Sequence, residues 1–359
     1  MRIMDEIKNI KYKLYSEPRD SVEKYRLFYN ENLFLPDEYY EKILEEADIK
    51  SSDLRFYQDP YNKSASIFLS DFLDMDKKMI LFANGVDHLI ILISELISKL
   101  KRRMDILYPT FDIYEEQANV QGIPVRKFFL KEDYSLNPDI LIEKSKNSFL
   151  IVCSPNNPTG KQFDKERILY LIENYNGIIV LDETYGDFAA YSLLDYIYEY
   201  DNLIVLRSFS KAYGLAGLRA GYAVSSENII NALRMFMDPY PTPLIVKKII
   251  KSAISNYSYV KKAIDETKNI RKIVFKELRK IPTVIPYPSE TNFIFFKTYL
   301  HKIVFRELAM RDIHIKDVSA KPLCENGLRV TLAPYNIISL FIKGLREIIG
   351  ENIGRQETS

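Results

Sequence analysis

The chain has 359 residues, of which 47% are hydrophobic, and this composition can fill the core of one large α/β domain with a smaller companion. It excludes a protein that is disordered throughout or fibrous. The 50 Lys and Arg residues almost balance the 49 Asp and Glu residues, which excludes a protein dedicated to binding nucleic acid or an anionic membrane.

Cysteine, histidine and the N-terminal sequence exclude further classes of protein. The two cysteines lie far apart, and the three histidines form neither a His-Cys cluster nor an HExxH motif, so we expect no metal site and no disulfide framework. The N-terminus has no apolar signal-peptide segment, and the most apolar helical stretch, residues 89–100, is too short and too charged to span a membrane. We therefore expect a cytoplasmic protein.

From about residue 80, short apolar runs alternate with longer amphipathic segments. Uninterrupted apolar strands are typical of a parallel sheet covered by helices on both faces. The alternation predicts a wound, mainly parallel α/β sheet with right-handed crossovers. We expect its strands at residues 105–108, 149–153, 177–181 and 203–206, with helices that include residues 88–101, 110–121 and 164–174.

The pattern changes after residue 234. A proline-rich stretch at residues 239–243 is typical of a hinge, and the elements beyond it predict a second, smaller α+β domain. We therefore expect an N-terminal arm at residues 1–35, a large domain at 36–238 and a small domain at 239–359. The elements expected in the small domain are one long helix at 244–279, strands at 292–296 and 327–331, a helix at 303–310 and a final helix ending at residue 349.

A lysine follows the last of the predicted parallel strands. In wound sheets, ligands bind beyond the carboxyl ends of the strands, which is where Lys211 lies. Burying its ammonium group is costly unless the lysine is paired or used, and one use is a Schiff base, because partial burial lowers the pKa of the amine. Taken alone, Lys211 is better explained as a lysine that starts a helix and faces solvent.

Two earlier strand ends carry polar residues of a complementary kind. Asp182 ends an apolar strand, and a carboxylate facing a pyridinium nitrogen keeps that nitrogen protonated. Asn157 and Tyr185 can both bond a phenolate oxygen. The alternatives are that Asp182 caps the next helix and that Asn157 belongs to an ordinary Asn-Pro turn.

Residues suited to holding a phosphate are present as well. Residues 84–87 precede a predicted helix, and backbone amides at a helix N-terminus can cradle a phosphate, although Asp87 is equally explained as a helix cap. Ser208, Ser210 and Arg219 supply hydroxyls and a bidentate cation. No single residue is specific for this chemistry. The order in which all of them follow consecutive strand ends is specific, because chance must produce the whole set together.

Three segments, residues 154–160 (SPNNPTG), 181–185 (LDETY) and 208–219 (SFSKAYGLAGLR), resemble the fold-type-I pyridoxal-phosphate enzymes of the class I/II aminotransferases. With the Asn-Glu-Asn box at residues 30–32, the chain is most similar to the histidinol-phosphate aminotransferase branch. The resemblance runs from Asn30 to the final helix. It implies a fold-type-I transferase that uses pyridoxal 5'-phosphate and forms a homodimer.

The resemblance also assigns roles to individual residues. Lys211 carries the cofactor as a Schiff base, and Asp182 pairs with the pyridine nitrogen. Lys316 stands where a second substrate arginine is frequent, which is a departure. Asn157 and Tyr185 are implied to bond the ring oxygen of the cofactor, and Phe111 to stack on its ring or, alternatively, to pack in the core. Tyr57 is implied to reach the cofactor phosphate of the partner subunit. The residues implied to bind the phosphate in the same subunit are Gly85, Val86, Asp87, Ser208, Ser210 and Arg219, and those implied to bind the substrate are Asn32, Lys316 and Arg329.

The implied reaction is transamination of L-histidinol phosphate with 2-oxoglutarate, a step of histidine biosynthesis. Two alternatives share every cofactor motif: a phospho-amino-acid decarboxylase similar to threonine-phosphate decarboxylase, and an aromatic amino acid aminotransferase. A transcriptional regulator on the same fold is disfavoured because the resemblance begins by Asn30. A dehydrogenase is excluded by the lack of GxGxxG after a first strand.

Overall fold

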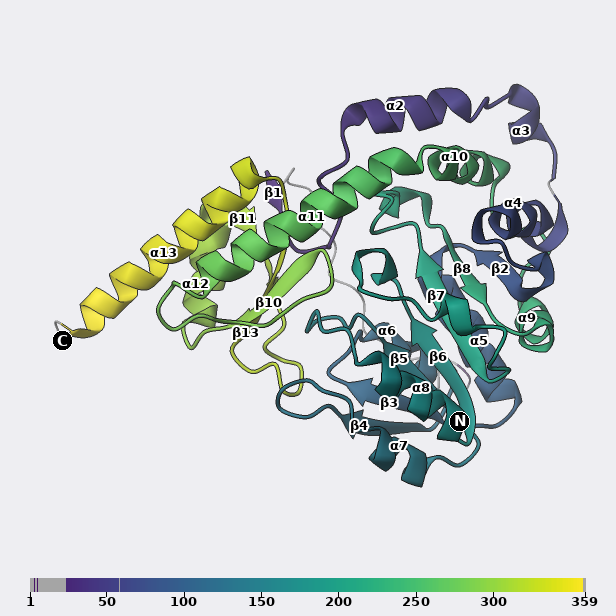
Figure 1. Cartoon of the computed structure of the whole chain (residues 1–359), viewed down its shortest axis with the longest axis horizontal. Helices are drawn as coiled ribbons and strands as arrows, with labels where there is room; N and C mark the ends of the chain where they lie inside the picture. The colour runs from purple at the N-terminus through teal and green to yellow at the C-terminus, as the bar shows by residue number, and fades with distance from the viewer. Residues whose placement is uncertain (1–2, 4, 6–23, 58, 358–359) are drawn as a thin grey trace.

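The computed structural model describes residues 3, 5, 24–57 and 59–357, so most of the predicted N-terminal arm lies outside the described residues. Its centre is a seven-stranded sheet in the order β2-β8-β7-β6-β5-β3-β4 (Figure 1). Only β8 runs antiparallel to its neighbours, which confirms the prediction of a mainly parallel wound sheet. The strands are β2 (Ile80–Ala83), β3 (Met104–Tyr108), β4 (Val125–Phe129), β5 (Ser148–Cys153), β6 (Gly177–Asp182), β7 (Leu203–Ser208) and β8 (Gly221–Val224).

The four predicted strands correspond to β3, β5, β6 and β7, each within two residues at either end. The sequence analysis did not predict β2, β4 or β8. Strand β4 is only partly buried at the edge of the sheet, and β2 and β8 are four residues long and next to glycine. Short or half-exposed strands carry a weak hydrophobic pattern, which is why these three were missed.

Both faces of the sheet are covered by helices, so its strands are apolar throughout. Along β5, Leu150 and Val152 belong to one hydrophobic cluster while Phe149, Ile151 and Cys153 belong to the other. This two-residue period matches the alternation of side chains along a strand. One face packs against α5 (Gly85–Lys99), α6 (Ile113–Val120) and α9 (Glu227–Arg234), and the other against α4 (Lys63–Leu73), α7 (Pro138–Lys144) and α8 (Lys165–Asn174).

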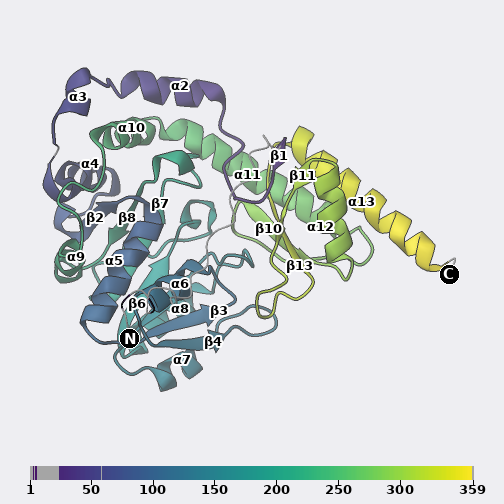
Figure 2. The same ribbon diagram turned by 180° about the vertical axis from the view of Figure 1, so that it is seen from behind.

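A second, four-stranded antiparallel sheet lies in the C-terminal part, in the order β12-β13-β10-β9. The helices α11, α12 and α13 lie around it, and α13 extends away from the large sheet in both views (Figures 1 and 2). The elements are β9 (Ile285–Pro286), β10 (Phe293–Lys297), β12 (Lys316–Asp317), β13 (Gly327–Thr331), α11 (Tyr257–Leu278), α12 (His301–Met310) and α13 (Tyr335–Glu357).

Two predicted C-terminal helices differ from the structure. The single helix expected over residues 244–279 is wrong: α10 (Leu244–Ser255) and α11 are separate, with Asn256 in a non-helical conformation between them. The side chain of Asn256 donates a hydrogen bond to Glu46 in α2 (Asp37–Glu46), a tertiary contact that its sequence neighbours do not reveal. The final helix continues to Glu357, past the predicted end at residue 349.

Residues 24–35 connect the two parts of the molecule. Strand β1 (Tyr25–Arg26) pairs in parallel with β11 (Ile313–His314), and the segment then reaches the loop that follows β7. Helix α10 packs against α2 and α4, so the domain boundary placed at residue 239 remains a prediction. Within the described residues, no helix is long and apolar enough to cross a membrane.

Candidate active site

The carboxyl ends of β5, β6 and β7 lie side by side and bring the polar segments together. In register, Cys153 is opposite Asp182, and Asp182 is opposite Leu206. The residues that follow each strand therefore share one edge of the sheet, where a wound fold binds its ligands. The sequence analysis placed Asn157, Tyr185 and Lys211 at this edge.

Asp182 is a buried carboxylate, only 3% exposed. Its Oδ1 accepts a hydrogen bond from the Thr184 backbone N–H at 2.9 Å, and its Oδ2 accepts one from the Tyr114 hydroxyl at 2.5 Å. Burial raises the pKa of Asp182, although both hydrogen bonds oppose this rise. Among the described residues no cation pairs with it, so a ligand with a protonated nitrogen would complete the electrostatics of this site.

Tyr114 was not singled out by the sequence analysis. It is buried on α6, at the face that packs on the sheet, and its ring meets the Phe111 ring edge to face at 6.0 Å. Because the chain has 26 tyrosines, no sequence signal distinguishes this one from core packing. Only the distance to Asp182 reveals that its hydroxyl fixes the carboxylate.

We expect Tyr114→Phe to weaken binding of pyridoxal phosphate about 10-fold, because a hydrogen bond to a charged group contributes ~1.5–3 kcal/mol. The dissociation constant is measured by titrating the apo-protein with cofactor. Tyr134→Phe is the matched control, since that buried hydroxyl bonds a backbone carbonyl, that of Leu323, instead of Asp182. A lower melting temperature with unchanged cofactor affinity would assign Tyr114 to structure alone.

The amine of Lys211 points into the site. Its Nζ donates a hydrogen bond to the carbonyl oxygen of Tyr29 at 2.9 Å and lies 5.9 Å from the centre of the Tyr185 ring. Burial, and then the positive charge of Arg329, lower the pKa of Lys211 to about 8. A neutral amine is therefore accessible near physiological pH, as a nucleophile or proton carrier requires.

Arg329, Asn157 and Tyr185 lie around this amine. Arg329 is buried on β13; its Nη1 donates to Asn157 Oδ1, and its Nη2 to the carbonyl oxygen of Phe28 at 2.6 Å. Among the described residues it has no carboxylate partner, and its buried Nε has no hydrogen-bond acceptor. Burial lowers its pKa. A desolvated guanidinium without a counter-ion is a site for an anionic ligand group.

Asn30 is a further residue that the sequence analysis left without a role of its own. Its Nδ2 donates to the Tyr185 hydroxyl at 2.9 Å, and its backbone N–H donates to Thr331 Oγ1 at 3.0 Å. Burial raises the pKa of Tyr185 to about 12, so this hydroxyl stays protonated. Asn30 thus links the segment of residues 24–35 to β6 and β13. Asn32 pins the same segment to the lysine loop by donating to the Ala212 carbonyl oxygen at 2.7 Å.

The first turn of α5 provides an anion cradle. The helix starts at Gly85, where φ is +82°, and Asn84 does not cap it, because the Asn84 side chain bonds Pro241 and Thr242 instead. The amides of the first turn are thus free of a side-chain cap. Asp87 lies inside this turn and pairs with Arg219 Nη2 at 2.7 Å.

The expected phosphate residues at the end of β7 and in the loop before β8 also lie near this turn, because Ser208 is opposite Gly221, and a Cβ atom at Gly221 would lie 3.1 Å from Gly85 C. The Ser210 backbone N–H donates to Ser208 Oγ at 3.1 Å. A Cβ atom at Gly85 would lie 3.2 Å from Arg219 Nη2, so the guanidinium and the helix N-terminus approach more closely than a larger residue would allow. The predicted residues Gly85, Val86, Asp87, Ser208, Ser210 and Arg219 therefore occupy one region.

The structure does not bring Tyr57 to this site. Its side chain is 87% exposed and stacks on Tyr240, with ring centres 4.9 Å apart. Lys316 is opposite Arg329 in the β12–β13 register and so lies on the same face of the sheet, although its side chain is exposed.

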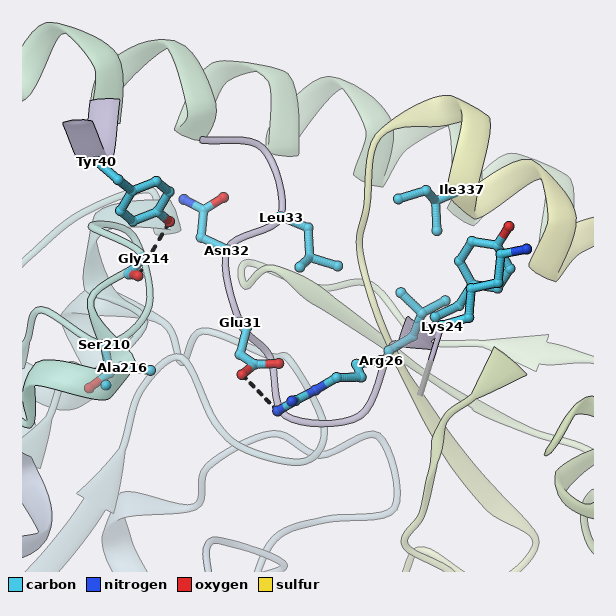
Figure 3. A pocket seen from close by; sticks show the side chains of 13 residues that line it. Lys24, Arg26, Glu31, Asn32, Leu33, Tyr40, Ser210, Gly214, Ala216 and Ile337 are labelled. Carbon is cyan, nitrogen blue, oxygen red and sulfur yellow. Dashed lines mark hydrogen bonds and ion pairs between the residues drawn. The ribbon is translucent and has the colours of Figure 1, made fainter. Parts of the chain in front are cut away.

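A pocket of about 410 Å³ adjoins the lysine loop (Figure 3). It opens between residues 24–33 on one side and residues 210–217 on the other. Arg26 and Glu31 point toward each other across it and form an ion pair of 3.1 Å, and the Tyr40 hydroxyl closes one end by bonding the Gly214 carbonyl (Figure 3). The pocket therefore borders the loop that carries Lys211, with Ser210 in its wall.

Comparison with known proteins identifies relatives. Residues 23–336 match the family described as aminotransferase class I and II. The histidinol-phosphate aminotransferase of Thermoanaerobacter sp. (strain X514) is 36% identical, over 97% of this chain and 98% of that protein. The structure resembles that of the histidinol-phosphate aminotransferase from Clostridium acetobutylicum (TM-score 0.83, 20% identity, covering 90% and 99% of the two chains). It also resembles L-threonine-O-3-phosphate decarboxylase from Porphyromonas gingivalis (TM-score 0.78, 23% identity, 90% and 99%).

Proposed function

Because the chain belongs to the class I and II aminotransferases, we propose that it transfers the amino group of L-histidinol phosphate to 2-oxoglutarate. The observation that carries this assignment is that several relatives of 31–36% identity, each matched over more than 90% of this chain, are histidinol-phosphate aminotransferases. The products are imidazole-acetol phosphate and L-glutamate. The site supports this proposal because it offers a lysine amine, a buried carboxylate and a buried arginine in one place.

Members of this family use pyridoxal 5'-phosphate, and the residues present fit that cofactor. The uncapped first turn of α5 and Arg219 fit its phosphate, and the unpaired carboxylate of Asp182 fits a protonated ring nitrogen. Tyr185 and Asn157 have hydroxyl and amide groups suited to its ring oxygen. When bound, the cofactor supplies an electron sink for the bond that breaks at the substrate Cα.

The chain's own residues carry out the proton transfer and hold the charges. With the cofactor bound, Lys211 Nζ would accept the proton from the substrate Cα and donate the same proton to the carbon of the cofactor that takes up the amino group, so no proton would be gained or lost. The pKa of about 8 suits both directions near neutral pH. Asp182 holds the positive charge of the ring nitrogen, and its two hydrogen bonds keep the carboxylate in a fixed orientation.

We assign to Arg329 the binding of the substrate's anionic group. The guanidinium is buried, and its Nε is left without an acceptor among the described residues. A phosphate or a carboxylate of the substrate can accept a hydrogen bond from this Nε. The reaction provides both groups, because L-histidinol phosphate is a phosphate ester and glutamate carries carboxylates. The pocket of Figure 3 is lined by Lys24 as well as by the ion pair of Arg26 with Glu31, so its lining has an excess of one positive charge.

We expect Arg329→Lys to raise the KM for L-histidinol phosphate about 10- to 100-fold and to lower kcat much less. Lysine keeps the charge but lacks the planar fork, and the loss of charge-assisted hydrogen bonds amounts to ~1.5–3 kcal/mol. Steady-state kinetics separate the change in KM from the change in kcat. Arg311→Lys is the matched control because its guanidinium pairs with Glu347 away from the site. An unchanged KM would remove Arg329 from substrate binding.

We also propose a homodimer in which Tyr57 reaches the cofactor phosphate of the partner subunit. The almost fully exposed Tyr57 ring, held against Tyr240 on the surface of its own chain, supports a role outside that chain. We expect sedimentation to give twice the mass of the chain. Tyr57→Phe should weaken cofactor binding about 10-fold, whereas Tyr240→Phe should not. A monomer at micromolar concentration, or equal effects of the two substitutions, would contradict this arrangement.

The proposed reaction is tested with a panel of amino donors. We expect glutamate to form from 2-oxoglutarate with L-histidinol phosphate at a kcat/KM at least about 10²-fold above that with phenylalanine or tyrosine, because only the former bears the phosphate. O-phospho-L-threonine is included, and carbon dioxide is measured. Carbon dioxide release would identify a decarboxylase, and preference for phenylalanine an aromatic aminotransferase. A cytoplasmic location is part of the proposal.

A further inference from the structure

A second cavity, of about 250 Å³, lies on the opposite side of the β7 end from the first turn of α5. It is bordered by the end of α4, the loop that holds Asp187 and Asp195, β7, β8 and the start of α11. Its most exposed aromatic lining residues are Phe72 and Tyr257, whose rings meet edge to face at 6.3 Å. This volume holds several waters or a small ligand.

The walls of the cavity are aromatic. Phe209 lies at the centre, with the Tyr213 ring 4.9 Å away and the Tyr222 ring 5.7 Å away. Tyr257 extends this wall, at 6.1 Å from Tyr213. Such a set of ring faces attracts a cation through the negative charge of the aromatic π systems.

Two of these tyrosines are buried polar groups without partners. Tyr213 and Tyr222 are 4% and 5% exposed, and neither hydroxyl forms a hydrogen bond with any residue that the structure describes. Burial raises the pKa of both hydroxyls; Asp187 raises it further and Arg207 opposes the rise, so both remain neutral hydroxyls. A buried hydroxyl that faces a cavity without a partner is satisfied by a ligand or by water.

The charge of the cavity is negative. Arg207 is its cation, and it is already paired with Glu183 at 3.0 Å and with Asp187 at 2.5 Å. Asp195 is the second carboxylate of the wall, whereas Glu183 lies behind it. With Asp187 and Asp195 against one paired guanidinium, the lining has an excess of one negative charge, which disfavours an anion. The aromatic walls favour an organic cation, whose carbon atoms they can contact.

We propose that this cavity is a binding site for a small organic ammonium ion, adjacent to the catalytic site, with which it shares Ser208. The ammonium group donates to the Asp187 carboxylate or to one of the unpartnered phenol oxygens, and its carbon atoms lie against the aromatic walls. The site is continuous with the lysine loop, because Ser208 and Tyr213 line the cavity and flank Lys211 in sequence. The proposal does not depend on which amine the enzyme transaminates.

The test is a calorimetric titration of the wild-type holoenzyme with trimethylammonium chloride at constant ionic strength. A titration with sodium chloride is the reference. A tertiary amine cannot condense with an aldehyde, so covalent reaction with the cofactor is avoided. We expect one site per chain with a Kd of ~1 mM, the affinity that four non-hydrogen atoms support. Absence of saturable binding up to about 100-fold this concentration would mean that the cavity holds only water, and would overturn the proposal.

Variants locate the site. Asp187→Asn should weaken binding about 10-fold by removing the charge-assisted hydrogen bond. Since Asp187 also pairs with Arg207, a double variant Tyr213→Phe/Tyr222→Phe tests the site without touching that pair, and should weaken binding about 3-fold or more. Tyr170→Phe, at an exposed tyrosine of α8 outside the cavity, is the control. Affinity that is unchanged in the double variant places the ion elsewhere and overturns the proposal.

Discussion

Lys211→Ala, saturated with pyridoxal phosphate, should transaminate at least about 10³-fold more slowly than the wild-type enzyme. The substitution removes the amine to which we assign cofactor binding and proton transfer at the substrate Cα, and general acid–base catalysis alone contributes up to about 10⁴-fold. The structure places no other lysine amine of the described residues against Tyr29 and Tyr185. The rate is measured in single-turnover experiments with L-histidinol phosphate.

Two further measurements distinguish a loss of catalysis from a loss of folding in Lys211→Ala. Lys161→Ala is the control, because Lys161 bonds the Asp133 carbonyl near the surface and should leave the rate unchanged. Added methylamine should restore part of the activity of Lys211→Ala, since it supplies the missing base. Turnover within about 10-fold of wild type, with no effect of methylamine, would show that Lys211 is not the base.

Asp182→Asn should lower kcat about 10²- to 10³-fold, the range found when a group that stabilises developing charge is removed. Asparagine keeps the size and can keep the hydrogen bonds of Tyr114 and Thr184, but it cannot hold a proton on the ring nitrogen by its charge. Because burial of the Asp182 carboxylate is costly, the apo-protein should be no less stable after the change. Rates and apo-protein melting temperatures are measured together.

The control for this prediction is Asp195→Asn, at an exposed carboxylate outside the catalytic site. If Asp182→Asn lowered the melting temperature of the apo-protein and left kcat unchanged, Asp182 would be a structural residue. If both Asp variants lowered kcat equally, the effect would arise from the net charge of the protein.

The sequence predicted the centre of the sheet because burial on both faces leaves an unmistakable pattern. Strands such as β5 and β6 contain almost nothing but apolar residues, so their ends, and the polar residues after them, are marked in the sequence itself. This pattern singles out Asp182 and Lys211 as candidate site residues. Their meeting at one edge follows from parallel pairing, which the alternation of strands and helices implies.

What remained hidden depends on contacts between distant segments. The separation of α10 and α11 at Asn256 involves Glu46, some two hundred residues earlier in the chain. The hydrogen bond between Tyr114 and Asp182 joins a helix to a strand end, and the sequence gives no sign of it among so many tyrosines. The same holds for Asn30, whose partners are Tyr185 in the loop after β6 and Thr331 at the end of β13.

The central claim is tested most directly by the absorbance spectrum of the wild-type holoenzyme during addition of L-histidinol phosphate. We expect the visible band of the lysine-bound cofactor to disappear as the amino group is transferred, and to return when 2-oxoglutarate is added. A band that ignores L-histidinol phosphate but responds to another amine would contradict the proposed substrate while leaving the family and the cofactor in place. If no band formed with pyridoxal phosphate, the assignment of Lys211 itself would be wrong.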